Sequence, residues 1–222
     1  MGGGGGGHYR FNGGAGSGEI ESGTFAVTSG TEYSVVVGIG GNCYSKGNSP
    51  ETGQPSSMGT LLTVKGGQVD CQNGGYSGAN GGSGGGGAGQ NLFSPMRCTS
   101  GANGGSAGSD AVACNNKVGG HGQGIAVLSI FKNKTFSAGV GGSAGRVDYR
   151  KDGWSYVAAG GGGGVLVNGE GPWAGSGTGS LYHGNGGQGY GAGGGTGGDD
   201  PEYAKGNGGK GAPGPVYVEW DY

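Results

Sequence analysis

The sequence predicts an all-β protein with almost no α-helix, in which short strands stand beside a bundle of extended glycine segments. Glycine supplies 68 of the 222 residues, and its runs alternate with short β-branched or aromatic segments. No stretch of ten or more residues has helical periodicity without several glycines inside it, and interior glycines destabilise helices. Aromatic residues make up 9% of the chain and charged residues only 12%, which is unlike a disordered linker. The composition therefore favours an ordered, helix-poor fold.

The glycine tracts are the first element to explain. An extended glycine segment takes the left-handed helix of the polyproline II type, which has three residues per turn and backbone groups that point outward. Without Cβ atoms, several such helices can pack side by side, exchange backbone hydrogen bonds and make close Cα–H···O contacts. We therefore expect a polyglycine II helix bundle. Five or six tracts are candidates, at residues 2–7, 13–18, 74–89, 101–108, 160–164 and 184–198.

The strand-like segments are repeated once along the chain. Two blocks share the same order of a short apolar segment, a turn, a second β-like segment and a closing Gly-x-Gly-Gly, at residues 25–41 and 125–142. Each block is followed by one more short strand, expected at 61–64 and at 154–158. A final strand is expected at 215–220. Internal repetition of this kind indicates related halves.

Length and charge bound the architecture and the partners. We predict one glycine-rich β domain over residues 1–222, with repeat-like halves 1–118 and 119–222. Twelve basic and 14 acidic residues give a net charge of -2, which argues against a nucleic-acid partner. No apolar run approaches the roughly 18 residues of a membrane span, so no membrane insertion is expected. Met1 leads straight into glycines, and no signal peptide is visible.

The cysteines leave two interpretations open. They are Cys43, Cys71, Cys98 and Cys114. No pair has the Cys-x-x-Cys spacing of a structural zinc site, so no metal site is predicted. An even count in a chain with a small core suits two disulfides, while four reduced and buried thiols fit equally well. Asn133 begins a glycosylation sequon, a tripeptide that also arises by chance.

The sequence offers no positive sign of catalysis or of a cofactor. Gly-x-Gly-x-x-Gly patterns follow from composition alone, and no helix follows them to bind a phosphate. The three histidines are far apart in the sequence, and no converging partners are apparent. Asp199, Asp200 and Glu202 could meet a calcium ion, but a solvated turn begun by Asp200-Pro201 explains them better. We expect a non-enzymatic protein.

Aromatic side chains that interrupt the later glycine tracts are the candidate ligand-binding residues. Rigid aromatic rings dominate recognition surfaces, and they stack on sugar faces beside polar groups that accept hydroxyls. The candidates are Trp173, Tyr182, His183, Tyr190, Asp199 and Tyr203. The alternative is that the rings cap the ends of the glycine bundle and exclude water.

Several motifs resemble a known family. After tracts 2–7 and 13–18, the segments GTFAVT at 23–28 and YSVVVGIGG at 33–41 resemble the glycine-rich domains at the tips of bacteriophage tail fibres. The ending GAPGPVYVEW is similar to the closing strand of that family. The layout is also similar to the TNF-like and glycine-rich region of the anaplastic lymphoma and leukocyte tyrosine kinase receptors. That second likeness is strongest at residues 120–131, Trp154 and 158–160, with a fainter one at Cys98 and Cys114.

The resemblance implies a jelly-roll or TNF-like β-sandwich packed on polyglycine helices, with loops that present a binding surface. It implies a virion surface or tail-fibre protein, either an adhesin that contacts a host-surface glycan or protein or a structural decoration. A secreted or receptor-ectodomain ligand-binding module and a self-assembling extracellular filament or matrix protein are the alternatives. The expected location is the virion surface or the extracellular space, and no cofactor is expected.

One departure from the family pattern predicts assembly. The pattern opens with a strand before the first glycine run, whereas here Met1 precedes that run directly. The closing strand, 215–220, would then lack its partner and present an open edge. We therefore expect a neighbouring subunit to supply a strand, in a homo-oligomer or a virion or filament assembly.

Overall fold

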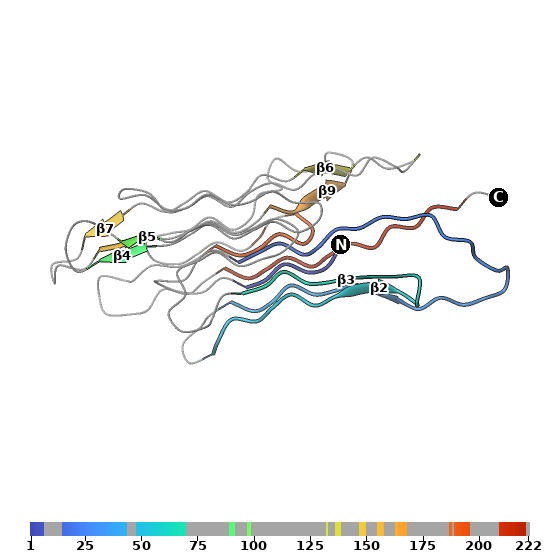
Figure 1. Ribbon diagram of the computed structural model, residues 1–222, viewed down its shortest axis with the longest axis horizontal. Helices are drawn as coiled ribbons and strands as arrows, with labels where there is room; N and C mark the ends of the chain where they lie inside the picture. The colour runs from blue at the N-terminus through green and yellow to red at the C-terminus, as the bar shows by residue number, and fades with distance from the viewer. Residues whose placement is uncertain are drawn as a thin grey trace.

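The computed structural model shows extended segments that run side by side, with short strands at their ends (Figure 1). It describes residues 1–6, 15–43, 48–69, 89–91, 97–98, 132, 136–138, 147–149, 155–157, 163–167, 187, 189–195 and 209–220. Within these ranges there is no helix, which confirms the expectation of a helix-poor, mostly β chain.

The strands form three small sheets, all antiparallel. The first has the order β1-β2-β3, the second β5-β4-β8-β7, and the third pairs β6 with β9. The strands are β1 (Val35–Val36), β2 (Ser56–Met58), β3 (Leu62–Val64), β4 (Gly89–Asn91), β5 (Arg97–Cys98), β6 (Phe136–Ala138), β7 (Val147–Tyr149), β8 (Ser155–Val157) and β9 (Val165–Val167). Among these strands, none contacts a strand of another sheet.

The expected strands are found in part. Strands β1, β3, β6 and β8 lie inside segments that the sequence analysis expects to be β, whereas the expected strand at 215–220 is not formed. The reason is that residues 209–215 belong to the glycine segments described below, and two prolines in that stretch, Pro213 and Pro215, have no N–H for a ladder. Beyond them, Tyr217 packs on Phe136 and Glu219 accepts a hydrogen bond from the amide of Lys132.

Residues 1–6 form a central segment whose N–H groups are hydrogen-bonded in steps of three. Every third residue donates to the same neighbouring segment, with N···O distances of 2.8–3.0 Å. The bonds run from Met1 to Pro215 and Gly4 to Ala212, from Gly2 to Glu19 and Gly5 to Gly16, and from Gly3 to Gln54 and Gly6 to Glu51. A period of three is that of the polyproline II helix. Because the partner number falls by three as the donor number rises by three, these three neighbours run antiparallel to the central segment.

The carbonyl groups of the central segment accept from three further segments. Gly3 accepts from Gly67, Gly4 from Gly41 and Gly5 from Gly194, at 2.7, 2.8 and 3.0 Å. These neighbours run parallel to the central segment. A Cβ on Gly2 or Gly5 would meet the carbonyl of Lys65 or Gln68, and one on Gly3 or Gly6 would meet that of Ile39 or Asn42. In the third neighbour, Gly191 lies beside the carbonyl of Gly2 and Gly194 donates to that of Gly5. The central segment therefore has six neighbours, which alternate in direction.

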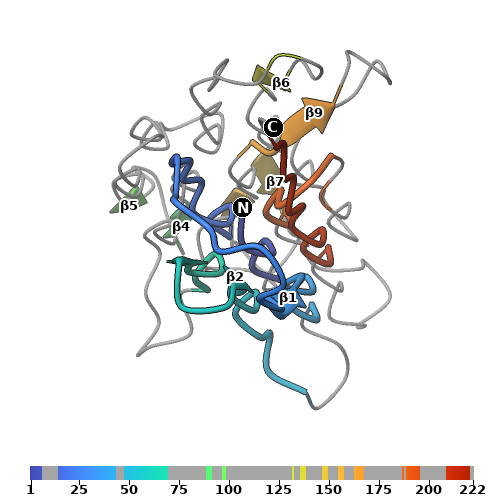
Figure 2. The same cartoon turned by 90° about the vertical axis from the view of Figure 1, so that its right-hand side faces the viewer.

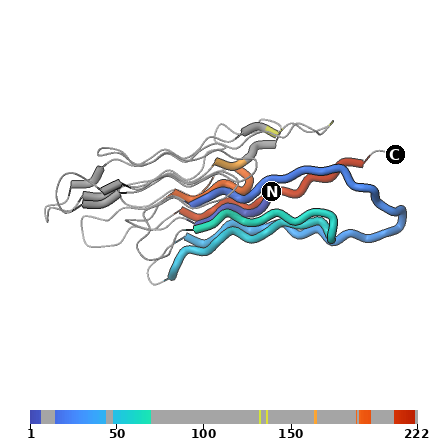
Figure 3. The backbone as a smooth tube through the Cα atoms, in the orientation of Figure 1, coloured from blue at the N-terminus to red at the C-terminus, as the bar shows by residue number. Residues whose placement is uncertain are grey.

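The six neighbours also bond to one another and close a ring. In ring order they are 15–20, 64–68, 51–56, 38–43, 209–215 and 191–195, and each adjacent pair shares at least one backbone hydrogen bond. With the central segment 1–6 they make up what we call the glycine bundle. The bundle members lie side by side in Figure 3, and viewed along the long axis such segments project as small triangles (Figure 2), as expected for three residues per turn.

Side chains contribute little to the core of this bundle. Residues 1–6 are all buried, and the buried apolar side chains include three alanines, Ala15, Ala192 and Ala212. Among the described residues, the largest fully buried side chains are those of Ser17 and Ser56. The core is therefore stabilised by backbone hydrogen bonds, whereas an ordinary core is stabilised by packing of apolar side chains.

The ring segments contain residues other than glycine because part of each turn of the outer segments faces solvent. In segment 38–43, Gly38 and Gly41 are buried whereas Ile39 and Asn42 are exposed. A threefold helix on the outside of a bundle points at least one residue in three at solvent, and a side chain fits at such a position. Exposed positions of this kind recur in steps of three at Glu51 and Gln54, Lys65 and Gln68, and Lys210 and Pro213.

Candidate functional site

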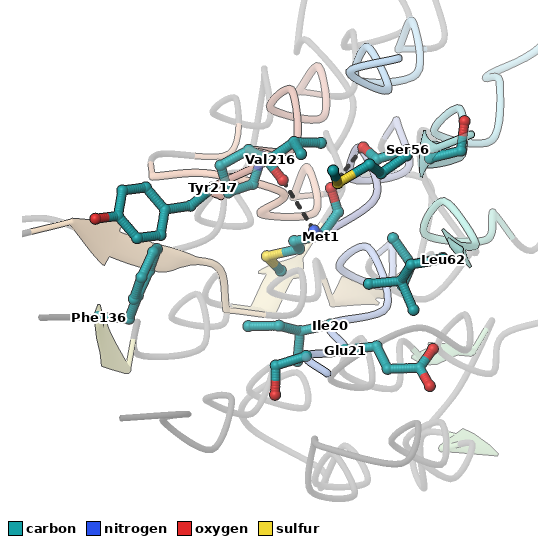
Figure 4. Close-up of a pocket in the computed structure, with 13 residues that line it drawn as sticks. Met1, Ile20, Glu21, Ser56, Leu62, Phe136, Val216 and Tyr217 are labelled. Carbon is teal, nitrogen blue, oxygen red and sulfur yellow. Dashed lines mark hydrogen bonds between the residues drawn. The ribbon is translucent and has the colours of Figure 1, made fainter. Parts of the chain in front are cut away.

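An apolar cavity of about 80 Å³ lies beyond Met1, at one end of the glycine bundle. The ring segments continue past the central segment there, as residues 20–22, β2, β3 and 215–217. Where glycine backbone no longer fills the middle of the ring, side chains line the space. The lining residues are Met1, Ile20, Glu21, Ser22, Ser56, Ser57, Met58, Leu62, Val64, Phe136, Pro215, Val216 and Tyr217. Figure 4 shows Met1 among these side chains, with Ser56 on one side and Val216 and Tyr217 on the other.

Ser56 joins the floor of the cavity to the bundle. Its hydroxyl donates to the carbonyl of Met1 at 2.7 Å and accepts from the amide of Gly38 at 2.8 Å. The side chain is 1% exposed, so both backbone groups are satisfied away from water. Ser56 thus ties the central segment to two ring segments at the level where the backbone bonding between them changes into the sheet of β1, β2 and β3.

Phe136 and Tyr217 form the aromatic side of the cavity. Their ring centroids are 5.8 Å apart and the rings are inclined by 66°, an edge-to-face arrangement. Desolvation and, after it, the negative charge of Glu219 raise the pKa of the Tyr217 hydroxyl. The phenol therefore stays protonated at neutral pH and can donate a hydrogen bond.

The α-amino group of Met1 is the one strongly perturbed titratable group among the described residues. It donates to the carbonyl of Pro215 at 2.9 Å, and burial lowers its pKa from 8.0 to about 6. Near neutral pH the amine is therefore mostly uncharged. A neutral donor is compatible with the apolar lining around it, whereas a buried charge without a partner is costly.

We predict that this amine makes the fold less stable as the pH falls. The unfolded chain, with a pKa near 8.0, binds the proton more tightly than the folded chain. The free energy of unfolding is therefore highest above pH 8, falls as the pH decreases towards 6 and then levels off. A shift of two units corresponds to about 2.7 kcal/mol at most. Denaturant titrations at about pH 8.5 and about pH 5.5 measure it.

A chain acetylated at the α-amino group is the control, because it cannot titrate there while all other groups are unchanged. The contribution of Met1 is the difference between the two pH profiles, and intact mass confirms that Met1 is retained. Identical profiles for the free and the acetylated chain would contradict the prediction.

The predicted ligand-binding residues mostly lie outside the described residues. These are Trp173, Tyr182, His183, Asp199 and Tyr203. Tyr190 is described, is 43% exposed and does not line the cavity. It precedes Gly191, which is bonded to Pro213 and lies beside Gly2, at the same end of the bundle as Met1. The residues that flank Asp199 and Tyr203, Gly195 and Gly209, lie at the opposite end, near Gly5 and Gly6.

The other predicted sites are placed only in part. Cys43 is a free, partly exposed thiol at the end of ring segment 38–43, and Cys98 is the last residue of β5. Cys71, Cys114 and Asn133 lie outside the described residues, so the pairing of the cysteines and the use of the sequon stay predictions. No group of three or more metal-ligating side chains occurs in the part of the chain that the structure describes.

Sequence reasoning missed the cavity. Its signal is a set of apolar residues at the junctions between glycine segments and strands, such as Ile20 after Gly18, Val64 before Gly66 and Val216 after Gly214. Each junction is ordinary by itself. Only the ring brings the junctions together around one space.

In the described residues the core consists of hydrogen-bonded glycine backbone, and apolar side chains line a cavity beyond one end of it. These features define a glycine-rich protein that is stabilised by packing of its backbone. A family model described as a glycine-rich domain matches residues 1–221, and the chain belongs to that family. No curated protein and no solved structure matches the chain. The described residues contain no helix long and apolar enough to cross a membrane.

Proposed function

We propose that the chain is a non-enzymatic recognition protein of the virion surface, an adhesin of the tail-fibre type that binds a host-surface glycan or protein. The observation that carries the proposal is the glycine bundle, in which one central segment is bonded to six others. Backbone packing at this density leaves few soft degrees of freedom, so it holds its connecting segments at defined positions. Binding residues placed on a rigid support lose less entropy when they bind.

The directions of the bundle segments support the proposal that the recognition surface lies at the end of the bundle away from Met1. The central segment and its three parallel neighbours all end on the side away from Met1, at residues 6, 43, 68 and 195. The connections that follow residues 6, 43 and 195 return to the bundle at 15, 51 and 209, on that same side. Three connections therefore start and finish at one end, and the third contains the ligand-binding candidates Asp199 and Tyr203.

The free thiol of Cys43 supports assembly in a reducing compartment, such as the cytoplasm in which virions form. A jelly-roll-like β unit is also part of the proposal. The three antiparallel sheets support it, because jelly-roll sandwiches are built from antiparallel strands.

Two alanine variants test the proposed surface, because Tyr190 and the flanks of Tyr203 lie at opposite ends of the bundle. Binding is measured on an array of bacterial surface glycans and on outer-membrane vesicles. Tyr203→Ala is expected to weaken binding at least about tenfold, which is the loss of about 1.4 kcal/mol typical of an aromatic hot spot. Tyr190→Ala is the matched control, because the proposed surface leaves out this one of the aromatic candidates, which lies at the Met1 end of the bundle, and it is expected to leave affinity within about twofold. Absence of binding to every glycan and vesicle, or equal loss in both variants, would contradict the proposal.

A further inference from the structure

Strand β1 is an edge strand, and among the described residues its outer backbone groups have no partner. It lies beside β2 on one side, with Val35 opposite Met58 and Val36 opposite Ser57, and it is the terminal strand of its sheet. Two further contacts show which residues face β2. The amide of Gly59 donates to the carbonyl of Ser34, and the amide of Gly38 donates to the Ser56 hydroxyl.

Alternation along the strand then identifies the outward-facing groups. In an antiparallel pair, every second residue directs both its N–H and its C=O at the partner strand. Since the carbonyl of Ser34 and the N–H of Gly38 are directed at β2, so are the backbone groups of Val36. The backbone groups of Tyr33, Val35 and Val37 face the other way, and no hydrogen bond of these three to any other residue occurs on that side in the described chain.

The side chains of this edge are apolar and exposed on both faces. Val35, Val36 and Val37 are 51%, 52% and 48% exposed. Edge strands of stable monomers usually carry a charge, a proline or a bulge that prevents pairing with another strand. Residues 33–37 contain none of these, and the nearest charged residue is Glu32.

We propose that β1 pairs with β1 of a second copy of this chain, antiparallel and centred on Val35. This register uses all three outward-facing residues, because Val35 meets Val35 of the second copy and Tyr33 meets Val37. Aromatic and β-branched residues are favourable cross-strand pairs. The two three-stranded sheets become one sheet of six strands, and the twofold symmetry closes the assembly at a dimer.

Charge is compatible with this partner. In the proposed register Glu32 lies opposite Gly38 of the second copy, and the two Glu32 residues are six positions apart along the joined strands. At about 3.3 Å per residue this is about 20 Å, beyond the screening length of about 8 Å at physiological salt. No like charges therefore oppose each other across the new pair.

Sedimentation velocity of the full chain over a concentration series tests the proposal. The wild type is expected to sediment as a dimer that dissociates on dilution. Val35→Lys with Val37→Lys places like charges opposite one another and is expected to raise the dimer Kd at least about tenfold. Val27→Lys is the matched control, because Val27 is 46% exposed but lies outside the strand. It is expected to leave the Kd unchanged.

Amide exchange gives a second readout that does not depend on the variants folding. In wild type, the amides of Val35 and Val37 are expected to be protected at high concentration and to lose protection on dilution, while Val36 stays protected at both because it faces β2. A wild type that is monomeric at every concentration would overturn the proposal. So would a dimer that survives the double lysine substitution, or exchange at Val35 that is independent of concentration.

Discussion

Gly4→Ala is expected to cost about 3 kcal/mol or more of the free energy of unfolding, a large fraction of the roughly 5–15 kcal/mol that keeps a domain of ordinary stability folded. A Cβ on Gly4 would stand closer than 3.0 Å to the carbonyl carbon and oxygen of Ala192 and to the carbonyl oxygen of Gly191. These are backbone atoms of a ring segment that is itself bonded on both sides. The segment cannot move away without breaking hydrogen bonds to its neighbours. Thermal and urea unfolding, followed by circular dichroism, measure the loss.

Gly30→Ala is the control for the same chemical change. Gly30 lies in the exposed turn before β1, has a φ of +80° and would place its Cβ against nothing within 4 Å. Alanine there is strained by about 1 kcal/mol, since the left-handed conformation disfavours a Cβ. Equal losses at Gly4 and Gly30 would show that residues 1–6 are not surrounded as described.

Ser56→Ala is expected to cost about 3 to 5 kcal/mol, the second large effect. The substitution removes the hydroxyl that the amide of Gly38 and the carbonyl of Met1 both use, and it leaves both groups buried without a partner. Each unsatisfied buried group costs about 1–3 kcal/mol. The measurement is the urea midpoint at constant m-value, because a change in m would indicate an altered unfolded state.

Ser57→Ala is the matched control for this loss. Ser57 is the next residue of β2, is only half-buried and keeps its ladder pairing to Val36 and Thr63 through backbone groups. The expected change is within about 0.5 kcal/mol. A cost at Ser57 as large as that at Ser56 would mean that the hydroxyl of Ser56 is not the link between the central segment and the ring.

The sequence predicted the helix-poor fold and the extended glycine segments, but it identified the bundle members only in part. Tracts 2–7, 13–18 and 184–198, which overlap the bundle members 1–6, 15–20 and 191–195, were recognisable because they are rich in glycine. Segments 38–43, 51–56, 64–68 and 209–215 were not, because they carry one or two exposed residues per turn and therefore look like loops or strand ends. The available signal was glycine in steps of three, as at Gly38 and Gly41 or Gly211 and Gly214.

The candidate site was less predictable than the fold. The aromatic candidates were chosen because they interrupt glycine tracts, and of these only Tyr190 falls among the described residues. The cavity beyond Met1 depends on Ile20, Val64 and Val216, which are separated by most of the chain. No local sequence pattern predicts that these junctions lie close together in space, because their proximity depends on the alternating direction of the segments in the ring.

Composition alone determined that this chain would avoid helices and that its glycine segments would have to bond sideways, since a polyproline II helix has no hydrogen bonds of its own. Only the tertiary structure decided which segment occupies the centre and which six surround it. The physical reason is that glycine backbone is chemically the same along every tract, so the sequence of a tract does not specify which other segments it packs against. The choice follows from where a side chain can be tolerated: nowhere along residues 2–6, and at exposed positions of the ring such as Ile39, Lys65 and Lys210.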